Sequence, residues 1–169
     1  MVIDNALAYS VGVFDGEGCI AIGIAGTKKE GKYIYFTGRV QLSITNTNKE
    51  LLEKVKDILL FPNKIYSQQR NPSMHSILYQ IIAQKPSDIL KIIALVEPVS
   101  LCTEELKLAR EACEYIMNIR KRHFYWDYQE IDSFDRKYVQ EGHKMKGYSA
   151  NRGSHRKYDW RKILTPPLV

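Results

Sequence analysis

Apolar and polar side chains alternate along the chain between Tyr35 and Thr45. Every second residue there is apolar or glycine, and the residues between them are polar. This period of two predicts a strand with one face in the core and one in solvent. A shorter alternation predicts a strand at Cys19–Ala25, and two runs around an Asn-Pro-Ser turn predict strands at Asn63–Arg70 and Ser76–Ala83. We expect Gly26–Gly31 to form a turn.

The first helix is expected at Ala6–Asp15, after Asp4 as its cap. Its side chains are small or apolar almost all the way round, so it should be buried on more than one side. A capping-box sequence at Thr47–Glu50 opens a second helix that continues through Leu60. Pro86 suits the first turn of a third helix.

A long helix is expected at about Cys102–Lys121, with acidic residues at its positive N-terminal end. A shorter helix near Asp132–Glu141 should end at Gly142. Together the elements indicate an α+β fold in the order αββαββα, which occurs once. We divide the chain into a core, 1–121, and a C-terminal helix with a basic tail, 122–169.

The net charge is +6, and the basic residues are concentrated at one end of the chain. Residues 1–119 carry 13 Lys and Arg against 13 Asp and Glu, whereas residues 120–169 carry 12 against 6. This distribution favours a polyanionic partner, although a solvated basic surface has the same composition. Three cysteines without a Cys-x-x-Cys pair indicate reduced thiols and an intracellular protein of unknown compartment. No apolar run is long enough for a membrane span.

The most specific stretch is Tyr9–Ile20, YSVGVFDGEGCI, in which two acids alternate with two glycines between a helix and a strand. Glycine allows a sharp turn there and exposes backbone carbonyls beside the carboxylates of Asp15 and Glu17. Carboxylate and carbonyl oxygens are ligands that suit Mg²⁺. The alternative is an ordinary polar turn with two solvated acids.

This stretch resembles the motif of the LAGLIDADG homing endonucleases, with Gly12 at its first glycine and Gly18 at its last. The element order, the Thr-Asn-x-x-Leu-Leu start of the second helix and the Lys-Pro-Ser start of the third also match. The resemblance covers roughly Ala6–Lys121 and is to the single-motif, homodimeric type, whose members are often intron-encoded. It implies an αββαββα fold in which a four-stranded antiparallel saddle binds double-stranded DNA, with C-terminal helices.

The resemblance also implies the catalytic roles. Glu17 and the Gly16 carbonyl would bind the metal, Mg²⁺ or Mn²⁺, and Ca²⁺ could occupy the site without supporting cleavage. Asn46 would orient the water network. The family usually has a basic residue near the start of the long helix, but Cys102 or Thr103 stands there. Lys107 and Lys49 are the candidate substitutes, although each could be an ordinary surface lysine.

Two further surfaces follow from the resemblance. Motif helices of two chains would pack across a two-fold axis through Val11, Gly12 and Phe14, while Asp15 would satisfy backbone donors near that axis. The saddle would contact DNA through the first turn and the outward strand positions. These are Lys28, Lys29, Lys32, Tyr35, Thr37, Arg39, Gln41, Ser43, Tyr66, Gln68, Arg70, Ser76 and Gln80.

The expected activity is metal-dependent hydrolysis of both DNA strands at a long pseudo-palindromic site, which would leave short 3′ overhangs. Three alternatives stay open: an RNA maturase on the same scaffold, a DNA-binding regulator without catalysis, and a binding module unrelated to nucleic acid. The aromatic run His123–Tyr128 could stack on a base or anchor the tail by packing. The tail itself could contact phosphates or be a solvated terminus.

Overall fold

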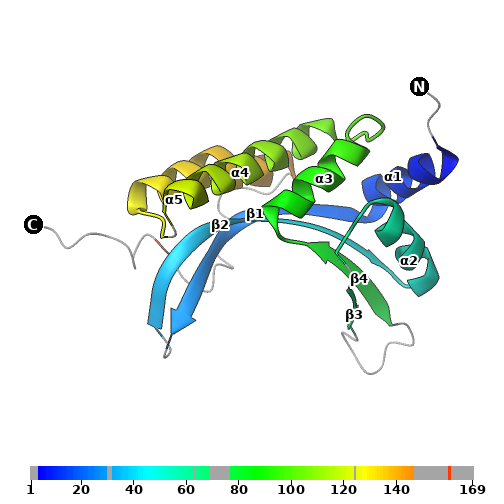
Figure 1. Ribbon diagram of the computed structural model, residues 1–169, viewed down its shortest axis with the longest axis horizontal. Helices are drawn as coiled ribbons and strands as arrows, with labels where there is room; N and C mark the ends of the chain where they lie inside the picture. Colours follow the sequence, from blue (N-terminus) through cyan, green and yellow to red (C-terminus); the bar gives the residue numbers. More distant parts are fainter. Residues whose placement is uncertain are drawn as a thin grey trace, which may run out of the picture. The chain divides into compact units, whose positions relative to one another are not determined.

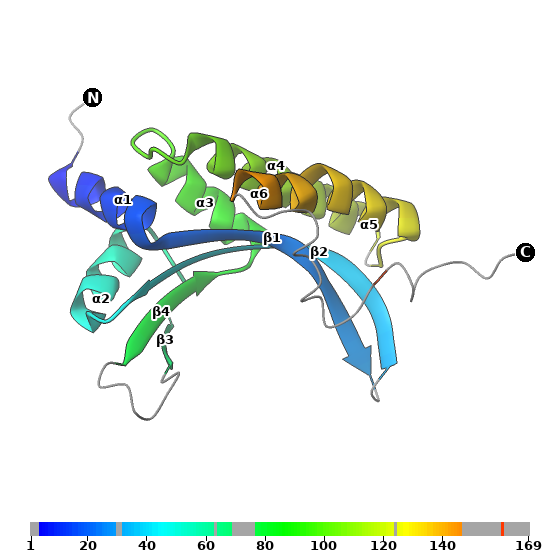
Figure 2. The same ribbon diagram turned by 180° about the vertical axis from the view of Figure 1, so that it is seen from behind.

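Helices and strands follow one another in the order that the sequence pattern predicts, and the α+β fold is confirmed. The computed structural model describes residues 4–29, 32–62, 64–68, 77–123, 125–146 and 160. Figure 1 and the reverse view in Figure 2 label the elements. They are α1 (Asn5–Glu17), β1 (Gly18–Lys29), β2 (Lys32–Asn46), α2 (Lys49–Ile58), β3 (Ile65–Gln68), β4 (Leu78–Ala83), α3 (Pro86–Val96), α4 (Thr103–Arg122), α5 (Tyr128–Phe134), the π-helical turn η1 (Asp135–Val139) and α6 (Gln140–Met145).

The four strands form one sheet in the order β1-β2-β4-β3. β4 pairs antiparallel with β2, where Thr45 faces Gln80, and antiparallel with β3, where Tyr66 faces the same Gln80. Residues directly opposite each other in a sheet share a face. The register therefore places Thr45, Gln80 and Tyr66 in one row across three strands.

The chain divides into two compact units. Unit 1 comprises residues 1–21 and 40–110, and its core is mostly aliphatic. α1 contributes Val11 and Phe14 to this core, and α2 packs against both α1 and β4. Buried apolar side chains of the strands, of α2 and its C-cap, and of α3 include Val40, Leu42, Ile44, Leu52, Val55, Leu59, Ile81, Ala83, Ile89, Ile92, Ile93 and Val96.

Unit 2 comprises residues 22–39 and 111–169, and its core combines a cluster of aromatic rings with aliphatic side chains. Tyr115 on α4 lies 5.7 Å from Trp126 and 5.8 Å from Phe134 between ring centroids. A Cβ on Gly38 of β2 would lie 2.6 Å from the Trp126 ring, so these rings need glycine at this strand position. In both views α5 lies beside the C-terminal end of α4 (Figures 1 and 2).

Three local expectations are wrong. Much of the expected turn Gly26–Gly31 is strand, since β1 continues to Lys29. The cap of α2 is Asn48, whose side chain accepts a hydrogen bond from Leu51 N at 3.0 Å, rather than Thr47. The last helix continues beyond Gly142 to Met145. The division of the chain between residues 121 and 122 stays a prediction.

Candidate active site and nucleic-acid interface

Glu17 is the last residue of α1, and its carboxylate is exposed. Asn46, the last residue of β2, donates a hydrogen bond from Nδ2 to Glu17 Oε2 at 2.6 Å. The Asn46 amide is fixed in turn, because its Oδ1 accepts from the backbone N–H of Asn48 at 2.7 Å. The ends of α1 and β2 and the start of α2 thus hold one acid in place in unit 1.

The helix itself gives this carboxylate no electrostatic support. The C-terminal end of a helix carries partial negative charge, which disfavours an acid there, and the last turn of α1 contains no basic residue. One neutral amide donor leaves most of the acceptor capacity of Glu17 unused by the hydrogen bond to Asn46. The site is therefore suited to attract a cation.

Gly18 fixes the turn from α1 into β1. Its N–H closes the helix by bonding to Phe14 O, and a Cβ there would stand 2.2 Å from the same oxygen. No residue other than glycine fits at this distance. Because Phe14 O accepts the last bond of the helical ladder, the ladder does not use the carbonyl of Gly16. That carbonyl and the Glu17 carboxylate lie at the same helix end.

Asp15 has a different environment from Glu17. It accepts hydrogen bonds from Ser100 Oγ at 2.5 Å and from the backbone N–H of Leu101 at 2.8 Å. Ser100 Oγ also accepts from the backbone N–H of Cys102 at 3.0 Å. Asp15 thereby ties α1 to the connection between α3 and α4. Burial, and secondarily the charge of Asp15, raises the pKa of the Cys102 thiol, which favours its neutral form.

A divalent cation fits these residues only in part. Mg²⁺ is commonly held by one or two carboxylates while it keeps several waters, and Glu17 with the Gly16 carbonyl offers such a donor pair. The described residues contain no group of three or more His, Cys, Asp or Glu that could hold a metal ion. Further oxygen ligands would have to come from a substrate phosphate, from water or from a second chain.

The basic residue of the site remains unassigned. Lys49 is engaged with Glu53 on α2, at 3.4 Å between Nζ and Oε1. Lys107 is exposed at the start of the second turn of α4. These positions favour neither lysine as a partner of Glu17.

The exposed face of α1 differs from the expected dimer seam. Val11 and Phe14 are only 1% and 2% exposed within a single chain, so they pack in its own core, and their expected role at a seam stays a prediction. The exposed stripe instead contains Tyr9, which is 62% exposed, together with Gly12 and Gly16. A Cβ on either glycine would meet nothing within 4 Å.

The outward face of the sheet in unit 1 carries polar side chains on β2, β3 and β4, with Leu78 and Ile82 of β4 on the same face. Gln84 donates from Nε2 to Gln41 Oε1 at 3.0 Å, and Thr45, Gln80 and Tyr66 form the row described above. Gln84 was missed in the sequence, although it continues the alternation of β4 one step beyond the expected strand.

The expected DNA contact of Ser43 stays a prediction. Ser43 is only 5% exposed, so it has little surface for a base. Gln68 lies in β3, but its side chain, like residues Arg70 and Ser76, is outside the described part.

In unit 2 the outward positions of β2 include Tyr35, Thr37 and the exposed Arg39. The backbones of Lys28, Lys29 and Lys32 lie in β1 and β2, and their side chains are outside the described part. The structure therefore leaves the expected role of these lysines a prediction.

Comparison with known proteins agrees with the motif. A sequence model described as LAGLIDADG endonuclease matches residues 10–113, which include Asp15, Glu17 and Asn46. The chain therefore belongs to the LAGLIDADG endonuclease family. No curated protein matches it significantly in sequence. No helix in the described ranges is long and apolar enough to cross a membrane.

Solved homing endonucleases have the same fold. The archaeal intron-encoded I-Vdi141I, complexed with DNA, is 18% identical with a TM-score of 0.66, and the match covers 94% of this chain and 92% of that one. I-CvuI, in complex with I-CreI target DNA and Mg, is 15% identical with a TM-score of 0.60 and 96% coverage of both chains. I-CeuI, a group I intron-encoded enzyme complexed with DNA, is 13% identical with a TM-score of 0.61, covering 89% of this chain and 72% of that one.

Proposed function

We propose that this protein is a homing endonuclease that cuts both strands of DNA at a long pseudo-palindromic site and leaves short 3′ overhangs. The observation that carries the proposal is the exposed Glu17 carboxylate, which Asn46 holds at 2.6 Å at the end of the motif helix. The polar side chains of the sheet face and the DNA complexes of solved proteins with this fold support DNA as the substrate.

Glu17 and the Gly16 carbonyl would hold a divalent metal, Mg²⁺ or Mn²⁺, which supplies charge neutralisation at the scissile phosphate and lowers the pKa of a bound water. Asn46 keeps the Glu17 carboxylate in one orientation, because its amide is itself held by Asn48. Its position suits the orientation of an attacking water beside the phosphate. Ca²⁺ could bind the same oxygens without supporting cleavage.

The chain carries one copy of the motif, so cutting two strands requires a second chain. A closed two-fold dimer presents the same surface to each half of the site, which accounts for a pseudo-palindrome. The exposed stripe of Tyr9, Gly12 and Gly16 on α1 is the surface that we assign to this contact, because small residues allow helices to approach closely. The seam then brings together the two Glu17 residues.

Glu17→Gln tests the proposal directly. The target duplex is first selected by the wild-type protein from a randomised library, and cleavage with Mg²⁺ is followed on a gel. We expect Glu17→Gln to abolish cleavage and to leave the Kd for the duplex within about threefold, since it removes a metal ligand but no base contact. The matched control is Glu104→Gln, an exposed helical acid that should retain cleavage.

Two results would contradict the proposal. Cleavage by Glu17→Gln would remove the site assignment, and a stable monomer on and off DNA in sedimentation would remove the dimer. If the wild-type protein binds the selected duplex without cutting it, a DNA-binding regulator is the better description. The Cys102-Thr103 sequence, where the family usually has a basic residue, gives that alternative its specific support.

A further inference from the structure

Tyr125 is an exposed aromatic residue outside the residues that match the family. It follows α4, is 63% exposed, and packs edge-on against Tyr35 of β2, with ring centroids 5.1 Å apart and an interplanar angle of 72°. Tyr35 belongs to the outward positions of β2, which also include Thr37 and Arg39. Tyr125 therefore adds a second ring beside the strand that we assign to the DNA face of unit 2.

The segment that carries Tyr125 is anchored on its C-terminal side. Trp126 is 5% exposed and packs against Phe134 at 5.3 Å between ring centroids. The side chain of Asp127 accepts a hydrogen bond from the backbone N–H of Glu130 at 2.8 Å, which caps α5. Because Trp126 and Asp127 are fixed, the adjacent backbone of Tyr125 is fixed as well.

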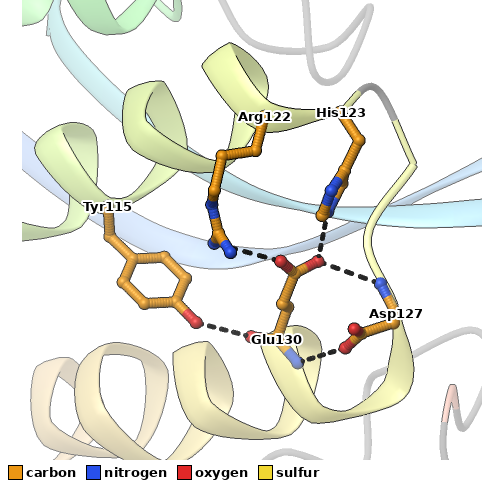
Figure 3. A network of polar contacts seen from close by, with 5 residues as sticks. All are labelled: Tyr115, Arg122, His123, Asp127 and Glu130. Carbon is orange, nitrogen blue, oxygen red and sulfur yellow. Dashed lines mark hydrogen bonds and ion pairs between the residues drawn. The ribbon is translucent and has the colours of Figure 1, made fainter.

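Glu130 joins this segment to the end of α4 (Figure 3). Its carboxylate, in a residue only 9% exposed, accepts a hydrogen bond from the backbone N–H of Asp127 at 3.1 Å and one from Arg122 at 3.1 Å. His123 Nε2 lies 2.8 Å from the same carboxylate. The residues before and after Tyr125 thus meet at one buried acid. An exposed tyrosine that is held this firmly loses little conformational entropy on binding a partner.

We propose that the Tyr125 hydroxyl donates a hydrogen bond to a DNA phosphate next to the base pairs that β2 reads, with Glu130 as a positioning residue. This inference rests on the proposed function. Tyr125 lies beside the strand rather than within it, and elements that flank a groove-reading strand meet the sugar-phosphate wall of the groove. Tyrosine is among the side chains that bond to phosphate, and such contacts fix the register of the protein without reading sequence.

Tyr125→Phe isolates the hydroxyl, because it keeps the ring against Tyr35. We expect it to weaken binding about tenfold, the size of one hydrogen bond to a charged acceptor, on the selected duplex and on an unrelated duplex alike. The substitution removes no cation from the protein, so the salt dependence of Kd should not change. Tyr128→Phe is the control, since that partly exposed ring packs against Trp160 and should leave binding unchanged.

The phosphate is located by methylphosphonate substitution, one position at a time, in the selected duplex. At one phosphate in each half-site, the methylphosphonate should weaken binding of the wild-type protein and should not weaken binding of Tyr125→Phe any further. In Glu130→Gln, which should keep the overall fold, the same methylphosphonate should weaken binding less than it does in the wild-type protein. If only Tyr125→Ala weakens binding, the contact is made by the ring and the hydrogen bond is wrong. If neither variant changes Kd, Tyr125 does not touch DNA. A wild-type protein that binds no duplex would instead remove the proposed function itself.

Discussion

The two units of the chain use their acids in opposite ways. In unit 1, Glu17 is exposed at a helix end and receives a hydrogen bond from one neutral amide. In unit 2, Glu130 is buried and its two oxygens meet Arg122, His123 and a backbone N–H. A carboxylate whose oxygens are already satisfied by protein donors is architectural, whereas one that keeps acceptor capacity at the surface can bind a metal or substrate.

The cores of the two units also differ, because unit 2 contains a cluster of aromatic rings and the core of unit 1 is mostly aliphatic. Unit 1 packs aliphatic side chains of α1, α2 and α3 on its part of the sheet, and most of it lies within the family match. In unit 2 the hairpin from β1 and β2 also lies within that match, but Trp126, Phe134 and Tyr138 follow it in the chain. The candidate acid Glu17 and its partner Asn46 therefore lie among the family-matched residues, and the aromatic cover of the hairpin comes from the segment after them.

Removing Trp126 should affect unit 2 far more than unit 1. Trp126→Ala deletes a buried ring that contacts Tyr115, Phe134 and the Gly38 position. We expect the free energy of unfolding to fall by about 3–5 kcal/mol. Hydrogen exchange should show lost protection in α5 and in residues 32–39 of β2, with α3 and β4 still protected.

Tyr125→Ala is the control for that experiment. It removes a neighbouring aromatic that is mostly exposed, so the loss of stability should stay below about 1 kcal/mol. If Trp126→Ala removes protection equally from α3 and β4, the two units unfold together. The conclusion that Trp126 stabilises unit 2 more than unit 1 would then be wrong.

The two motif acids give a second, smaller contrast. Asp15→Asn keeps one oxygen but cannot accept from both Ser100 Oγ and Leu101 N as the carboxylate does. We expect it to lower the free energy of unfolding by about 1–3 kcal/mol in urea titrations. Glu17→Gln changes an exposed group and should cost less than about 0.5 kcal/mol. Equal losses, or a larger loss for Glu17→Gln, would contradict the division into a structural and a catalytic acid.

Periodicity predicted the elements of unit 1 well because each of them buries one side. The even positions of β2 from Val40 to Ile44 are all buried, as the alternation indicates, and Pro86 opens α3. The faces of α1 were harder to assign. A helix with apolar residues all round has no pattern that separates the side chains buried in its own chain from those that could contact a partner chain. Val11 and Phe14, which the sequence analysis placed at a seam between two chains, are buried within one chain.

The remaining differences arise from contacts between distant segments. Ser43 is buried where β2 pairs with β4, and no local pattern records that pairing. For the aromatic run after α4, the sequence favoured packing over stacking on a base. The structure separates its members, because Trp126 is buried and Tyr125 is exposed. Sequence composition cannot predict which of two neighbouring aromatic side chains is buried, because that depends on the direction in which the backbone points each of them.

The smallest effect should be a gain, confined to unit 1 and away from its site. Leu60 has a φ of 58°, in the left-handed region, and lies two residues after the end of α2. The backbone N–H of the next residue, Phe61, donates a hydrogen bond to Lys56 O at 2.9 Å. Glycine is the residue best suited to this position, so Leu60→Gly should raise the free energy of unfolding by about 0.5–1 kcal/mol. The side chain is mostly exposed, so little packing is lost. Lys54→Gly, within the exposed face of the same helix, should instead lower stability by about 1 kcal/mol. Both are measured as shifts in the urea midpoint at constant m-value. A loss of stability in Leu60→Gly would mean that Leu60 makes packing contacts worth more than its backbone strain.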